Sequence, residues 1–184
     1  MSTLHPDPRQ DWENRVAAAW KIADTLTPQE LVRTIDALAA QRPPQDPCAL
    51  FERACARDTA GIEDAAEPLY RAALASGGLD DYRHARASLQ LGSTLRLLGR
   101  LDESEALLLA QRERCRTQGP GAVLHDETRA LLALTWLAQG RAKEAATLAL
   151  VTLAPHLTRY QRSMAANARE LGGVGPVPAQ RGEA

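Results

Sequence analysis

The feature that most constrains this chain is a glycine that recurs between apolar patterns of helical spacing, at Gly61, Gly99 and Gly140. A turn glycine adopts a backbone conformation that a β-carbon would oppose, and it can end one helix where an antiparallel neighbour begins. A small residue lies seven positions before each glycine and another lies five positions after it. These residues are Ala54, Gly92 and Ala133 before the glycines, and Ala66, Ser104 and Ala145 after them. Because small side chains let two helices approach closely, the pattern predicts a series of antiparallel helix pairs.

The rest of the chain is also predicted to be helical, which makes the expected fold class all-α. Apolar residues recur every three or four positions, and the β-branched Val and Ile that favour strands are scarce. Three helix starts carry a capping residue followed by proline at the first helical position, namely Asp7, Thr27 and Asp46. About nine helices are expected, near residues 8–24, 28–41, 47–59, 62–76, 80–98, 101–117, 122–139, 141–154 and 156–171.

Two segments flank the repeating part of the chain. The linker "AQRPPQDP" separates an N-terminal helix pair, in residues 1–46, from the repeats in residues 47–171. Trp12 and Trp20 share one face of the first helix. This face either caps the open end of the repeats, as terminal units must, or associates with a second copy to form a homo-oligomer. Residues 172–184 lack apolar periodicity and are expected to be a disordered tail.

The charge and hydropathy patterns argue against nucleic acid and membranes as partners. The formal net charge is −1, so no overall field draws the protein to an anionic surface. The basic cluster Arg112, Arg114 and Arg116 is interrupted by Glu113 and has no aromatic run beside it to stack bases. No segment has the length of a membrane span, and the N-terminus lacks the apolar run of a secretory signal. We therefore expect a soluble, cytoplasmic protein.

No motif for catalysis or metal binding is present. The four histidines lack the spacing of a zinc helix, and the three cysteines form no CxxC pair. The stretch "HDET" at residues 125–128 has the residue types of a catalytic triad, but Asp126 is better explained as a helix cap or first-turn acid. We therefore expect that the protein is not an enzyme and that it has neither a cofactor nor a metal site. Its cysteine thiols are expected to stay reduced.

Three stretches resemble the tetratricopeptide repeat. "LQLGSTLRLLGRLDESEALL" has Gly92, Leu95, Gly99, Ser104 and Leu108 at the offsets of that repeat. "GIEDAAEPLYRAAL" is similar to the second half of another repeat, and "LLALTWLAQGRAKEAATLAL" is similar to a third. The phrases "FERACARDTAGIEDAAEPLYRAALASGGL" and "QLGSTLRLLGR" also resemble a group of short bacterial tetratricopeptide proteins, whose members mostly lack an assigned function. The resemblance covers roughly residues 48–171.

The resemblance implies an α-α superhelix of antiparallel helix pairs, a solenoid that binds other proteins and has no catalytic residues. The sequence departs from the repeat pattern at four positions. Gln111 and Thr152 stand where alanine is usual, and Arg53 and Arg57 replace apolar residues.

In a superhelix of this kind, the first helix of each pair lines the concave face, where partners usually bind. The second pair would place a polar stripe there, bordered by acidic residues of the first pair and by leucines of the third. The residues predicted to line this groove are Phe51, Glu52, Cys55, Asp58, Arg86, Leu89, Gln90, Ser93, Arg96, Glu127, Leu131 and Leu134.

Two functions fit such a groove. The first is an adaptor or scaffold that holds a peptide or helix of another protein. The second is a sensor or regulatory subunit that holds a small anion with Arg86 and Arg96, because guanidinium groups bind carboxylate and phosphate through paired hydrogen bonds. A structural alternative is that the stripe is internally paired, with Asp58 bonded to Arg96 and Glu52 to Arg86.

Overall fold

The structure is a computed structural model that describes residues 7–118 and 122–173. Within these residues the fold is all-α, with nine α-helices and no strand, as predicted. The helices are α1 (Pro8–Lys21), α2 (Pro28–Ala39), α3 (Pro47–Thr59), α4 (Glu63–Ala75), α5 (Asp81–Leu97), α6 (Leu101–Gln118), α7 (His125–Ala138), α8 (Ala142–Leu153) and α9 (Gln161–Leu171). The tail predicted from residue 172 lies outside the described residues from position 174 onward.

The helices begin where capping residues were predicted. The side chain of Asp7 accepts a hydrogen bond at the start of α1, and Asp46 does the same at the start of α3. Thr27 and Glu30 form a capping box at the start of α2, in which each side chain bonds the backbone of the other residue. The largest difference in bounds is at α9, which begins at Gln161 rather than near residue 156, because Ala154–His156 forms a separate 3-10 turn.

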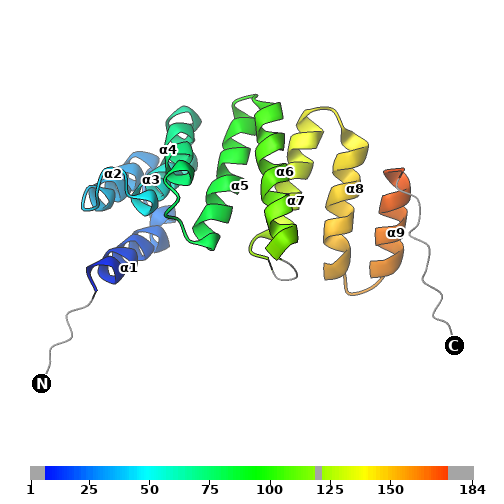
Figure 1. The fold of residues 1–184 in the computed structure, drawn as a ribbon, viewed down its shortest axis with the longest axis horizontal. Coiled ribbons are helices and arrows are strands. Elements are labelled where there is room, and N and C mark those ends of the chain that lie inside the picture. The colour runs from blue at the N-terminus through cyan, green and yellow to red at the C-terminus, as the bar shows by residue number, and fades with distance from the viewer. Residues whose placement is uncertain (1–6, 119–121, 174–184) are drawn as a thin grey trace, which may run out of the picture. The chain divides into compact units, whose positions relative to one another are not determined.

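The chain divides into two compact units between Leu98 and Gly99. Unit 1 contains α1 to α5, and unit 2 contains α6 to α9 (Figure 1). Within each unit, helices that follow one another in sequence pack side by side. This division falls inside the segment predicted to carry the repeats.

The turn glycines have the backbone conformation that their spacing predicted. Gly61, Gly99 and Gly140 have φ angles of 70°, 75° and 81°. At each, an added β-carbon would meet no atom within 4 Å, so the backbone angle and not crowding demands glycine there. The six small residues around the turns are all buried, in accord with close helix approach: Ala54, Ala66, Gly92, Ser104, Ala133 and Ala145.

The N-terminal helices pack onto α3 within unit 1. Trp12 and Val16 of α1 share a buried cluster with Cys48 and Ala49 of α3. The Trp12 side chain is 2% exposed, and its indole N–H donates to the backbone oxygen of Leu38 at 2.9 Å. Trp12 and Val16 therefore belong to the core of unit 1.

Candidate functional site

Several residues predicted to line a groove are instead inside unit 1. Phe51, Cys55 and Leu89 are at most 5% exposed. They are covered because α3 packs against both α4 and α5. The Phe51 ring lies 6.3 Å from that of Tyr70, whose hydroxyl contacts Cys55 Sγ at 3.5 Å. The expectation that these three side chains lie on an open face is therefore corrected: they belong to the core.

Glu52 is also buried, at 5% exposure, and it is paired internally. Trp20 of α1 donates its indole N–H to Glu52 Oε2 at 2.7 Å, and Arg83 Nε lies 3.7 Å from Oε1. Burial raises the pKa of Glu52, although the Trp20 hydrogen bond and the Arg83 charge oppose this shift. The predicted alternative paired Glu52 with Arg86, and the structure corrects that partner to Arg83, one turn earlier on α5.

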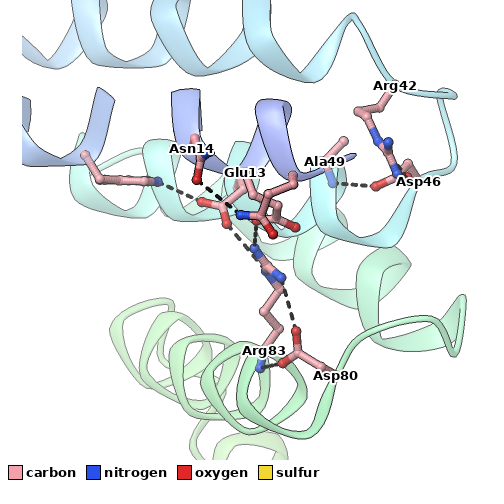
Figure 2. Close-up of polar contacts among 10 residues, drawn as sticks. Glu13, Asn14, Arg42, Asp46, Ala49, Asp80 and Arg83 are labelled. Atoms are coloured by element: carbon pink, nitrogen blue, oxygen red, sulfur yellow. Dashed lines mark hydrogen bonds and ion pairs between the residues drawn. The ribbon is translucent and has the colours of Figure 1, made fainter. Parts of the chain in front are cut away.

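Arg83 is the centre of a polar network that was not predicted from the sequence. Its guanidinium bonds Glu13 of α1, and it also bonds Asp80, the N-cap of its own helix, at 3.1 Å (Figure 2). Together with Glu52, these contacts join α1, α3 and α5. The basic residues Arg83 and Arg86 lie three positions apart on one helix, so spacing alone does not indicate which of them meets the buried acid.

Asp58 differs from its predicted partner as well. It accepts hydrogen bonds from the Tyr70 hydroxyl at 3.3 Å and from the Thr94 hydroxyl at 3.2 Å. Burial raises the pKa of Asp58, and the two hydroxyl donors only partly offset the shift. The ion pair expected with Arg96 is not formed, and Arg96 Nε is buried without a hydrogen-bond partner among the described residues.

The substitution Asp58→Asn is expected to change the pH dependence of unfolding. Because the folded pKa lies above the unfolded value of 3.8, the folded state holds the proton more tightly. The contribution of Asp58 to the free energy of unfolding is therefore fully present below pH 3.8, and it is lost as the pH rises through the folded pKa. The free energy of unfolding of Asp58→Asn, minus that of the wild type, should therefore increase from about pH 4 to pH 7. Urea unfolding followed by circular dichroism measures this difference, and a constant or falling value would contradict the assignment.

The polar stripe of α5 is half-buried. Arg86, Gln90, Ser93 and Arg96 all retain partial exposure. The Arg86 guanidinium lies over the Phe51 ring, 5.2 Å from its centroid, and near the ring of Tyr82 at 5.7 Å. These cation–π contacts hold the Arg86 charge at the surface of unit 1, where it remains able to meet an acidic group.

In unit 2 the predicted residues lie on the exposed side of α7. Glu127 is exposed, Leu131 is half-buried and Leu134 is 47% exposed. Leu137, one turn beyond Leu134, is 56% exposed. Glu127 and Ala130 line a cleft of about 940 Å³, whose other walls come from the ends of α6 and α8.

The same cleft contains a hydrogen-bonded cluster that was not predicted from the sequence. Asp126 contacts His125 Nδ1 at 3.0 Å and His156 Nε2 at 2.9 Å. Partial burial opposes ionisation of Asp126, but the hydrogen bonds from His156 and His125 outweigh it and lower the Asp126 pKa. Asp126 lies in the first turn of α7, as expected. Among the described residues, no group of three or more His, Cys, Asp or Glu side chains is arranged to hold a metal ion.

Comparison with protein families found one match, to a family described as "Tetratrico peptide repeat", over residues 47–171. This match covers more than half of the chain. The chain belongs to the tetratricopeptide repeat family. A search of curated proteins and a search of solved structures each found no match. Tetratricopeptide repeats are in general protein-interaction modules and are typically non-enzymatic.

Three of the four departures from the tetratricopeptide pattern have structural explanations. Arg53 and Arg57 of α3 both pair with Asp36 of α2, at 3.1 and 2.9 Å, and so attach the N-terminal helices to the first repeat. Gln111 and Thr152, where alanine is usual, are buried. The Thr152 hydroxyl donates a hydrogen bond to the backbone oxygen of Leu148, one turn earlier in its own helix, and so its donor is satisfied.

In residues 7–118 and 122–173, no helix is both long and apolar enough to cross a bilayer.

Proposed function

We propose that this tetratricopeptide protein is a non-catalytic adaptor that binds a peptide or helix of another protein along the exposed side of α7. The observation that carries the proposal is the exposure of Leu134 and Leu137, at 47% and 56%, on a well-formed helix. Large apolar side chains scattered singly on a surface are ordinary, whereas a continuous apolar strip marks an interaction site.

The strip on α7 continues into the cleft of unit 2. Ala130, Leu134 and Leu137 follow spacings of four and three, so they lie on one side of the helix. Ala130 lines the cleft, as does Leu153 of α8, which is 49% exposed. An amphipathic helix anchors in such a surface through apolar residues at the same spacing. Glu127 at the near end would meet basic residues of the partner.

The half-buried stripe of α5 in unit 1 is proposed as a second contact surface. Arg86, Gln90, Ser93 and Arg96 offer donors to acidic or polar groups of a partner. The alternative function, a sensor that holds one small anion between Arg86 and Arg96, is less well supported. The two residues are ten positions apart, about 15 Å along a helix, and the Arg86 guanidinium lies on aromatic rings.

A site-specific photo-cross-linker tests the proposed surface. With p-benzoylphenylalanine at position 134, we expect one dominant adduct to a second protein in cells. Leu137→Glu, introduced beside the cross-linker, should reduce this adduct at least tenfold, because a charge would have to be buried against the partner. The matched control carries the cross-linker at Leu109 of α6, which is 38% exposed.

Three results would contradict the proposal. The first is the same set of adducts from positions 134 and 109, which would indicate unspecific contact. The second is an adduct at 134 that is insensitive to Leu137→Glu. The third is an adduct with the mass of two copies of this chain, which would indicate self-association instead of an adaptor. Circular dichroism establishes that each variant keeps its helix content.

A further inference from the structure

Another cavity in unit 2, of about 310 Å³, lies between α7, α8 and α9. Arg129 and Trp136 line it from α7, Leu148 and Val151 from α8, and Arg169 from α9. Its lining differs from that of the larger cleft, and it has no part in the function proposed above. The residues combine two cations with an apolar wall.

The two arginines line the same cavity, and the charge of Arg169 acts on Arg129. Among the described residues, neither Arg129 nor Arg169 has a carboxylate within ion-pair distance, and both are half-buried. Burial lowers the pKa of Arg129, nearby Asp126 opposes this shift, and the charges of Arg112 and Arg169 add to it. Like charges that face one cavity destabilise each other, and a bound anion would remove that repulsion.

The other polar groups of this cavity do not supply a counter-ion. Glu144 lines the cavity, but its carboxylate pairs with Arg141 at 3.2 Å. The Trp136 N–H already donates to Glu105 at 2.6 Å. Thr147 also lines the cavity, and its hydroxyl oxygen is buried without a hydrogen-bond partner among the described residues. The cavity therefore combines an apolar wall with hydrogen-bond donors that have no acceptor within the described part of the chain, namely the Thr147 hydroxyl and the two guanidinium groups.

The repeat register shows that Arg129 is unusual at its position. It lies eleven residues before the turn glycine Gly140. The equivalent positions of the two earlier repeats hold Leu50 and Ser88, which are 5% and 2% exposed. This position of the repeat therefore faces the protein interior, where burial of an arginine without a partner lowers the stability of the fold.

From these observations we infer that the cavity binds a small organic acid with a short hydrocarbon chain. Arg129 and Arg169 pair with the carboxylate, from helices on two sides of the cavity. The hydrocarbon chain packs against Trp136, Leu148 and Val151. Guanidinium groups match the planar carboxylate through paired hydrogen bonds, and the apolar wall excludes a fully hydrated inorganic anion as the preferred ligand.

Titration of the full chain with hexanoate tests this inference. The three tryptophan indole N–H groups give separate signals in a ¹H–¹⁵N correlation spectrum, and Trp136→Phe assigns the one in the cavity. We expect the Trp136 signal to shift saturably with hexanoate while the Trp12 and Trp20 signals stay in place. Hexan-1-ol has the chain without the charge, and inorganic phosphate has charge without the chain. Each should shift the Trp136 signal at least tenfold less effectively at equal concentration.

Variants of each arginine separate binding from folding. Arg129→Gln and Arg169→Gln should each weaken hexanoate binding at least tenfold, which corresponds to the loss of a charge-assisted hydrogen bond. Their melting temperatures should not fall, because each substitution relieves repulsion. Arg112→Gln removes a nearby charge outside the cavity lining and should change binding less than twofold. The inference is overturned if hexanoate leaves Trp136 unmoved at 10 mM, if hexan-1-ol or phosphate binds equally well, or if both glutamine variants retain wild-type affinity.

Discussion

Replacing Arg83 by methionine is expected to lower the free energy of unfolding of unit 1 by about 3 kcal/mol. The Arg83 side chain is 18% exposed and it lies between Glu13, Glu52 and Asp80. Its removal would leave Glu52 buried without its nearest cation, and an uncompensated buried charge costs more than the ion pair itself contributes. Methionine keeps most of the apolar stem, so the loss would reflect charge more than packing.

Urea unfolding of the full chain, followed by circular dichroism and tryptophan fluorescence, measures this effect. Arg15→Met is the matched control, because Arg15 and Asp11 form an exposed pair, at 45% and 52% side-chain exposure, that contributes less than about 1 kcal/mol. The double variant Arg83→Met/Glu52→Gln should recover most of the lost stability. If Arg83→Met costs no more than Arg15→Met, the network has no part in holding unit 1 together.

Trp12→Ala is expected to destabilise unit 1 by about 3–5 kcal/mol, the usual cost of deleting a buried aromatic side chain. Trp12 is 2% exposed, donates to Leu38, and has the Arg42 guanidinium 5.4 Å from the centre of its ring. The alanine would leave a cavity between α1 and the helices that it covers. Trp12→Phe keeps much of the volume and should cost considerably less.

The same variant separates the two roles suggested for the tryptophan face. Light scattering during size-exclusion chromatography should give Trp12→Ala the same mass as the wild type, because the ring is enclosed within its own chain. A variant with unchanged urea midpoint and a halved mass would instead establish a self-association surface. Both measurements use the same purified sample at several protein concentrations.

The helices and turns were predictable from the sequence because they depend on local chemistry. Asp46 caps the helix that follows it, whatever the rest of the chain does, and Gly140 needs its positive φ for the turn alone. The helix ends were less predictable. Tyr160 takes a φ of 66° immediately before α9, and nothing in its side chain signals this conformation.

The candidate surfaces were only partly predictable, because burial depends on which helices meet. Phe51 and Cys55 have the spacing of a groove face, but α4 and α5 cover that part of α3. Asp58 accepts hydrogen bonds from two hydroxyl groups, whereas its predicted partner was an arginine. The cavity at Arg129 did leave a signal in the sequence. Arg129 is a charged residue at the position of the repeat that is occupied by Leu50 and Ser88 in the other two repeats.

The network around Arg83 also affects how unit 1 unfolds. In a chain of helical repeats each element usually contacts only its neighbours, so terminal helices can fray independently. Here a side chain of α5 bonds one of α1, seventy residues away in the sequence. Loss of α1 would therefore expose Glu52 and release Arg83, which penalises partial opening. This coupling raises the cooperativity of unit 1, so backbone amides in α1 and α5 should exchange hydrogen in a common opening event.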